Sequence, residues 1–173
     1  MAANDGAAGR HMAALQQAIK DDVDDQVLRH ANSYLAVQQD EEVLLCKIVA
    51  LARTGKYQQA QQLIGGVKKS DDFLKFLKAY LAYRLGSYQE AIDIADSCMN
   101  DPKMNILKSQ VHCKRENYEM SCNILANMIN DKSPDTKSIY EDLCSNFFNS
   151  LALYAWILVS VRFVIIRQKN RLS

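Results

Sequence analysis

The sequence predicts an all-α fold that is built of paired helices. Apolar residues recur at spacings of three and four from about Ala13 to Ile129, which is the period of a helix rather than the alternation of a half-buried strand. Gly and Pro, which interrupt helices, number only 6 and 2 in 173 residues. Short breaks separate segments of roughly 10 to 15 residues, the lengths expected of helical hairpins.

The expected helices lie between short breaks that are rich in polar residues and Gly. In chain order, these breaks are 21–22, 39–40, 54–55, 65–66, 70–71, 86–87, 101–102, 116–117 and 133–134. Asp71 and Ser133 are expected to cap the helices that follow them, because their side chains can accept bonds from the first free N–H groups. Pro102 and Pro134 suit a first helical turn, where no N–H donor is needed.

An internal repeat becomes visible when the breaks are aligned. The segments RTGKYQQA (53–60), RLGSYQEA (84–91) and KRENYEMS (114–121) share one pattern. Its turn position is held by Gly55, Gly86 and Glu116, which follow one another at nearly equal intervals. A step of 34 back from Gly55 reaches Asp21, which predicts a degenerate first unit with Val23 in the tyrosine position and Gln26 in the small-residue position. The chain is therefore expected to contain four helix pairs.

This pattern resembles the tetratricopeptide (TPR) repeat over about residues 13–130, and the resemblance implies a right-handed α-solenoid of helix hairpins. A turn-former lets the first helix end, an aromatic residue two positions later fills the hairpin, and a small residue three further on lets the helices approach. The resemblance implies these packing residues: Gly55, Tyr57, Ala60, Ala79, Gly86, Tyr88, Ala91, Tyr118 and Ser121. The family's three small positions correspond to Ala79, Ala91 and Cys98, to Ile48, Ala60 and Val67, and to Ser109, Ser121 and Met128. Ile48 departs from the pattern, which argues against close packing inside the second hairpin.

In the TPR arrangement, the first helix of each pair lines a concave groove. The resemblance implies that the groove-facing residues are Glu42, Leu45, Val49, Ala52 and Arg53, then Phe73, Phe76, Tyr80, Tyr83 and Arg84, then Lys103, Ile106, Gln110, Cys113 and Lys114. We expect the groove to hold a segment with hydrophobic anchors and some acid, because its floor is apolar and cations follow one edge. The candidate partner residues are Arg53, Phe76, Tyr80, Tyr83, Arg84, Lys103, Gln110 and Lys114. Aromatic residues at this spacing could equally pack against the neighbouring repeat.

The sequence offers no set of residues for catalysis, and we expect no enzyme, no cofactor and no metal. The three histidines, at 11, 30 and 112, lie in no metal-ligand spacing. His112 and Cys113 are adjacent, but neighbours on a helix point about 100° apart and do not form a catalytic pair readily. The five cysteines contain no CxxC pair and are odd in number, which favours a reducing compartment.

Composition also limits the partners. The chain has 49% hydrophobic and 24% charged residues, so it can bury a core and is not expected to be disordered. Its 21 Lys and Arg against 20 Asp and Glu give a formal net charge of +1, so no bulk positive field attracts nucleic acid or an anionic membrane. Residues 1–10 lack the apolar segment of a secretory signal, which predicts a cytoplasmic location.

Two runs give a closer resemblance. LLCKIV (44–49) and FLKAYLAYRL (76–85), each followed by its hairpin turn, are similar to the N-terminal TPR region of the seventy-two-kilodalton subunit family of the signal recognition particle. That resemblance implies a non-enzymatic scaffold within the ribonucleoprotein that targets nascent secretory chains to the endoplasmic reticulum (ER). Its groove would receive a segment of the particle's sixty-eight-kilodalton subunit, called the companion subunit below. The family's RNA contact is implied for a basic region beyond the repeats, so contact with the particle RNA would be indirect here.

The chain is expected to change character near its C-terminal end. We assign a flexible N-terminus to residues 1–12, the repeat domain to 13–150 and an apolar tail with a basic end to 151–173. Residues 147–166 would reach about 30 Å as a helix, enough to cross a bilayer. Three interpretations stay open: a tail anchor, a terminal helix or strand packed on the last repeat or at an oligomer contact, and a truncated or variant end.

Two alternatives to the particle scaffold also remain. One is a TPR adaptor or co-chaperone that serves another complex. The other is a tail-anchored membrane protein that displays a cytosolic TPR array.

Overall fold

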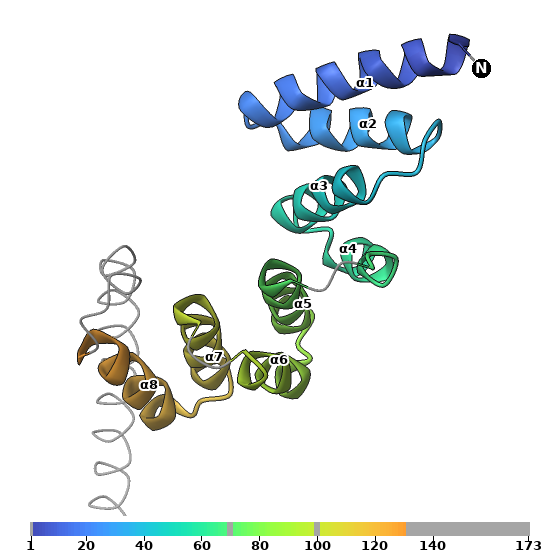
Figure 1. Ribbon diagram of the computed structural model, residues 1–173. Helices are drawn as coiled ribbons and strands as arrows, with labels where there is room; N and C mark the ends of the chain where they lie inside the picture. The colour runs from blue at the N-terminus through green and yellow to red at the C-terminus, as the bar shows by residue number, and fades with distance from the viewer. Residues whose placement is uncertain (1, 69–70, 99–100, 131–173) are drawn as a thin grey trace, which may run out of the picture. The chain divides into compact units, whose positions relative to one another are not determined.

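The computed structural model describes residues 2–68, 71–98 and 101–130, and all of the regular structure in these ranges is helical. Figure 1 shows the helices in chain order. They are α1 (Ala2–Lys20), α2 (Asp24–Leu35), α3 (Glu41–Arg53), α4 (Tyr57–Ile64), α5 (Asp72–Arg84), α6 (Tyr88–Asp96), α7 (Pro102–Lys114) and α8 (Tyr118–Asn130). The described residues divide into two compact units, with the boundary after residue 90, inside α6.

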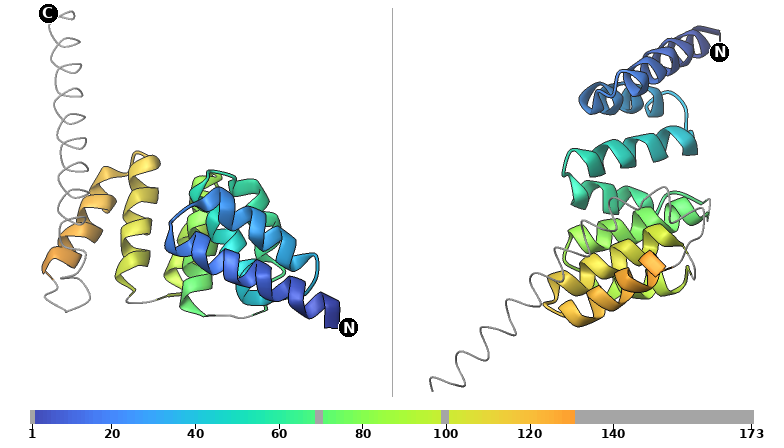
Figure 2. Two further views of the ribbon diagram at one scale, coloured as in Figure 1. Left: turned by 90° about the horizontal axis from the view of Figure 1, so that it is seen from above. Right: turned by 90° about the vertical axis from the view of Figure 1, so that its left-hand side faces the viewer.

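In the first unit, each helix packs on the next one along the chain, from α1 on α2 to α4 on α5. Figure 2 shows this order from two further directions. One continuous apolar core joins these helices, with contributions that include Leu15, Ala31, Ile48, Ala60, Leu74 and Leu81. In the second unit, α7 packs on α8, and its buried residues include Met104, Leu107, Val111 and Leu125.

Four turns in the described residues share one backbone conformation. The residue two positions before the second helix has a positive φ, which is 56° at Asp22, 77° at Gly55, 83° at Gly86 and 61° at Glu116. The residue after it donates its N–H to the carbonyl five positions earlier. These bonds are Val23 to Ala18, Lys56 to Leu51, Ser87 to Ala82 and Asn117 to His112, at 2.8–3.1 Å. They are the six-to-one bonds of a Schellman motif, which closes the first helix and reverses the chain.

The turn geometry corrects the register of the first repeat. The residue with positive φ is Asp22 rather than Asp21. Val27, three residues into α2, is buried at 5% exposure, whereas Gln26, which the sequence alignment placed there, is exposed. The alignment was one residue out because no glycine marks this turn, and an aspartate adopts the left-handed conformation instead.

The second helices of the next three hairpins begin alike. Each starts with a half-buried tyrosine and has an almost fully buried small residue three positions later; the pairs are Tyr57 with Ala60, Tyr88 with Ala91, and Tyr118 with Ser121. The equivalent residues of the first helices, Ile48, Ala79 and Ser109, are at most 1% exposed. Ile48 is therefore accommodated: α3 packs on α4 despite the larger side chain.

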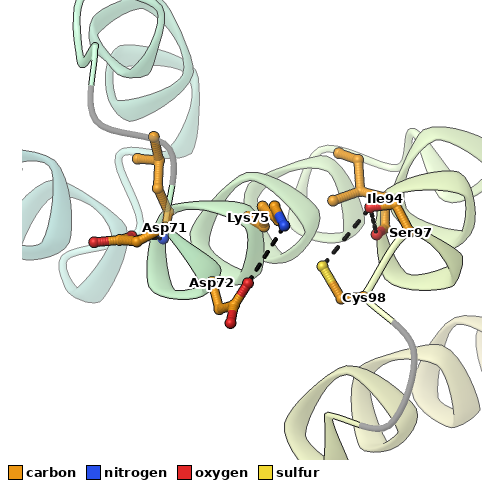
Figure 3. A network of polar contacts seen from close by, with 7 residues as sticks. Asp71, Asp72, Lys75, Ile94, Ser97 and Cys98 are labelled. Atoms are coloured by element: carbon orange, nitrogen blue, oxygen red, sulfur yellow. Dashed lines mark hydrogen bonds and ion pairs between the residues drawn. The ribbon is translucent and has the colours of Figure 1, made fainter.

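Capping residues fix where several helices begin. Asp40 and Asp71 accept backbone N–H bonds at the starts of α3 and α5, and Asp101 does so before Pro102 at α7, as N-cap carboxylates do. In α5, Asp72 also pairs with Lys75 over 3.3 Å (Figure 3). Near the end of α6, the hydroxyl of Ser97 donates to the carbonyl of Ile94 over 2.6 Å, as the same figure shows. The cap predicted at Asp71 is present, and Pro102 lies in the first turn of α7 as predicted.

Helix α1 begins at Ala2, although the sequence analysis assigned residues 1–12 to a flexible N-terminus. Alanine is the strongest helix former, and this segment is rich in it. Ala8 is 6% exposed and belongs to the core of the first unit. The helix was missed because alanines give little amphipathic pattern.

Predictions for residues 131–173 lie outside the described residues. They concern Ser133 and Pro134, the end of the domain placed at 13–150, the segment 147–166 and the tail at 151–173. Within the helices that the structure does describe, none is both long and apolar enough to cross a bilayer.

Candidate partner-binding surface

An apolar pocket of about 230 Å³ lies in the first unit. Its lining comes from the end of α1, the start of α2, one face of α3 and the first turn of α5; the residues are Ile19, Asp22, Asp24, Val27, Leu45, Cys46, Val49, Ala50, Arg53 and Phe73. Leu45, Val49, Arg53 and Phe73 were assigned to the groove from the sequence, and the structure brings these four together. Ile19 and Phe73 are 47% and 50% exposed, so large apolar side chains stand at the surface here.

Arg53 is paired within the chain. Its Nη2 lies 2.6 Å from Oδ1 of Asp22, and its Nε lies 3.1 Å from Oδ2 of Asp24. The bond to Asp22 and the charges of both carboxylates raise the pKa of Arg53 above its usual value. From the sequence, this guanidinium was expected to meet acid in a partner, whereas Asp22, in the turn before α2, and Asp24, the first residue of α2, already meet it.

A second feature of the first unit is a stack that involves α4 and α5. The rings of Phe76 and Tyr80 stack at 6.4 Å between centroids, and the rings of Tyr80 and Tyr57 are nearly perpendicular, with centroids 6.5 Å apart. Cζ of Arg84 lies 4.4 Å from the centroid of the Tyr57 ring, and its Nη1 donates to the hydroxyl of Tyr80 over 2.8 Å. The ring centroids of Tyr83 and Tyr88 lie 6.3 Å apart. These aromatic side chains support one another and stay partly exposed.

The remaining predicted partner residues lie on α7, in the second unit. Lys103 and Lys114 are exposed and Gln110 is half-buried. Their spacing of seven and four residues places them along one face of this helix.

Sequence reasoning missed the part of the pocket supplied by α1 and α2. Ile19, Asp22, Asp24 and Val27 line it, but none of these residues was assigned to the groove from the sequence. The alignment placed the first repeat one residue out of register, so Gln26 was assigned the buried position that Val27 occupies. One signal in the sequence could have indicated this side of the pocket. The apolar Ile19 precedes a run of acidic residues, and Arg53 lies one repeat later in the chain.

Among the described residues, burial shifts the pKa of two cysteine thiols and of one histidine away from the charged form. Burial raises the pKa of the Cys46 thiol, with further contributions from Glu42 and Asp40, and burial also raises the pKa of Cys122. Burial lowers the pKa of His112, helped by Lys108 and Arg115, which disfavours the imidazolium that a thiolate partner would need. In the described part of the chain, no group of three or more His, Cys, Asp or Glu could hold a metal ion.

Comparison with known proteins identifies the family. Residues 20–138 match the family SRP_TPR_like, described as "Putative TPR-like repeat", and this match spans more than half of the 173 residues. The chain belongs to the SRP TPR-like repeat family. The family's TPR-like repeat agrees with the paired helices and their shared Schellman turns.

Curated relatives of this SRP TPR-like chain include signal recognition particle subunit SRP72. The Caenorhabditis elegans protein is 32% identical over 96 residues, 54% of this chain and 15% of the relative. The Homo sapiens protein is 27% identical over 112 residues, 62% of this chain and 17% of the relative. The matched region is therefore less than a fifth of either relative.

A solved structure supports the fold of the SRP TPR-like chain. It is MamA, residues 41 to the end, from Desulfovibrio magneticus RS-1, with a TM-score of 0.62 and 15% identity. The match covers 86% of this chain and 95% of MamA. At this identity the likeness concerns the fold alone, an all-α TPR-like solenoid.

Proposed function

We propose that this SRP TPR-like chain is a non-enzymatic scaffold of the signal recognition particle, and that it holds a segment of the companion subunit, the particle's sixty-eight-kilodalton protein. The relatives named SRP72 and the family match support the particle as its setting. In this role the chain acts in the cytoplasm, reaches the particle RNA through its partner and associates with the ER during targeting.

The observation that carries the proposal is the surface of α3 and α5 in the first unit. These first helices of successive hairpins present an apolar pocket with exposed Phe73 and, further along α5, partly exposed Phe76, Tyr80 and Tyr83. Partly exposed aromatic residues held in place by neighbours lose little freedom on binding, which suits them to anchor a partner. Exposed apolar surface of this kind marks an interaction site in a soluble domain.

The test uses the full chain and overlapping peptides that cover the companion subunit, with binding followed by fluorescence anisotropy. Tyr83→Ala should weaken binding of the peptide that docks by about 2 kcal/mol and leave the melting temperature nearly unchanged. Met120→Ala is the matched control, since Met120 is 46% exposed on α8 and was not assigned to the groove.

A large fall in melting temperature with unchanged affinity would assign Tyr83 to the core instead. If no peptide of the companion subunit binds and affinity purification recovers chaperones without particle components, the proposed function is wrong. The adaptor class would then remain.

A further inference from the structure

The pocket of the first unit has the size of a side-chain site. Its volume of about 230 Å³ is below the range of about 300–1,000 Å³ that is usual for small-molecule sites. Val27, Leu45 and Val49 supply apolar walls, and the half-exposed Ile19 and Phe73 stand beside them. Such a pocket accepts one large apolar side chain from a protein segment rather than a metabolite.

The charges of the pocket lining do not balance. Its ionisable carboxylates are Asp22 and Asp24, and its one cation is Arg53, so the lining carries a formal charge of −1 near neutral pH. Both carboxylates contact the guanidinium, yet a carboxylate offers about four acceptor sites. Acceptor capacity therefore remains toward solvent, and the Asp22 side chain is 69% exposed.

Further negative charge lies near Cys46, which also lines the pocket. Glu42 precedes Cys46 by four residues on α3 and therefore lies on the same face of that helix. Besides burial, the carboxylates of Glu42 and Asp40 raise the pKa of the Cys46 thiol. Glu42 belongs to the first turn of α3 and Asp40 caps that helix. Acidic groups thus lie on the side of the pocket at the start of α3 as well as where α2 begins, at Asp22 and Asp24.

We propose that this pocket binds a large apolar side chain of a partner segment in which Lys or Arg flanks the apolar residue. This proposal rests on the proposed function, because it requires the surface of α3 and α5 to bind a peptide segment. The sequence predicted an acidic partner segment near Arg53, whereas this proposal requires a basic one. The apolar residue supplies burial, and the flanking cation meets the uncompensated carboxylate, which selects among segments and speeds their association.

The first experiment selects binders from a displayed library of random twelve-residue peptides on the full chain at near-physiological salt. We expect enriched peptides to carry Leu, Ile, Met or Phe with Lys or Arg within a few positions. Enrichment of acidic flanks, or the absence of any enriched class, overturns the proposal.

The second experiment measures affinity of one enriched peptide for charge variants of the chain. Arg53→Gln removes the cation and leaves both carboxylates, so binding of a basic peptide should tighten by about two- to fivefold. Asp22→Asn should weaken it by a similar factor. Both effects should shrink when ionic strength rises from about 0.15 M to about 1 M, where the Debye length falls from about 8 Å to about 3 Å. If Arg53→Gln weakens binding, the guanidinium itself contacts the peptide and the proposal is wrong.

Two apolar variants locate the binding. Phe73→Ala should weaken binding of the same peptide by about tenfold or more. Met120 is similarly exposed, and Met120→Ala should leave the affinity within about twofold. An equal effect of both substitutions would place the peptide elsewhere and overturn the proposal.

The two proposals fail separately. If peptides of the companion subunit bind with an affinity that Arg53→Gln and Asp22→Asn do not change, only the charge preference is refuted. Basic library peptides that bind while no peptide of the companion subunit does refute only the assignment to the particle.

Discussion

The guanidinium of Arg84, at the last residue of α5, lies over the ring of Tyr57, at the first residue of α4, with 4.4 Å from Cζ to the ring centroid. The contact joins the second helix of one hairpin to the first helix of the next. Tyr80 holds the same guanidinium through its hydroxyl over 2.8 Å. Arg84 therefore links two hairpins and also fixes the orientation of an aromatic ring on the candidate partner surface.

We predict that Arg84 and Tyr57 are energetically coupled. A double-mutant cycle with Arg84→Ala and Tyr57→Leu, measured by chemical denaturation, should give a coupling of about 0.5–1 kcal/mol, as expected of an exposed cation–π contact. A second cycle that pairs Arg84→Ala with Gln59→Leu provides the control, because Gln59 is exposed and has no ring for the guanidinium to face. Strictly additive effects in the Arg84–Tyr57 cycle would contradict the prediction.

The turn before α8 should gain stability from glycine. Glu116 has a φ of 61°, a conformation that costs a residue with a Cβ about 1–2 kcal/mol. Glu116→Gly should raise the free energy of unfolding by about 1 kcal/mol, measured by urea denaturation. Glu119→Gly, inside the first turn of α8, should lower it by about the same amount.

The converse substitution at the turn before α6 isolates the backbone effect. Gly86 has a φ of 83°, and a Cβ built there meets nothing within 4 Å. Gly86→Ala should therefore destabilise the protein by about 1–2 kcal/mol through conformation alone. A neutral result at Gly86 together with no gain at Glu116 would refute the role assigned to these turns.

Much of the fold followed from local chemistry that is written in the sequence. Gly55 and Gly86 mark turns because they adopt positive φ without a Cβ, and the tyrosines two residues later mark the next helix start. The same logic failed at Asp22, where an aspartate occupies the left-handed conformation without a glycine to signal it. It also failed for the start of α1, whose alanines favour a helix but leave no face to recognise.

The candidate site was less accessible to sequence reasoning because its charges pair between hairpins. Arg53 was expected to be available to a partner, and the sequence places it a full repeat away from Asp22 and Asp24. Only the packing of α3 on α2 brings these groups within 3.1 Å or less. The local pattern predicted a groove-facing position for Arg53. Whether its charge is already paired within the chain depends on tertiary structure.

The small residue three positions into α4 should not tolerate enlargement. Ala60 is fully buried, in the core of the first unit, so extra methyl groups must displace packed neighbours. We expect Ala60→Leu to lower the free energy of unfolding by about 1–3 kcal/mol. Gln59→Leu is the matched control on an exposed position and should change stability by less than about 0.5 kcal/mol. Equal effects of the two variants would contradict the packing role.

The stability of the first unit should fall at alkaline pH through Tyr34. Tyr34 is 5% exposed, and its hydroxyl donates to Oδ2 of Asp40 over 3.4 Å. Burial, and then the charge of Asp40, raise the pKa of Tyr34 above its ordinary value of 10.0. A raised pKa means that the folded state favours the protonated phenol, so this contribution is complete below pH 10.0 and is lost as the pH rises through the folded-state pKa.

The measurement is chemical denaturation at several pH values between about 8 and about 11, on the wild-type chain and on Tyr34→Phe. The wild type should lose stability more steeply above pH 10.0 than the variant, because phenylalanine has no proton to lose and other tyrosines titrate equally in both proteins. Parallel curves would mean that Tyr34 ionises as easily in the folded chain as in the unfolded one. The hydroxyl would then face solvent rather than Asp40, and the junction between α2 and α3 would lack this contact.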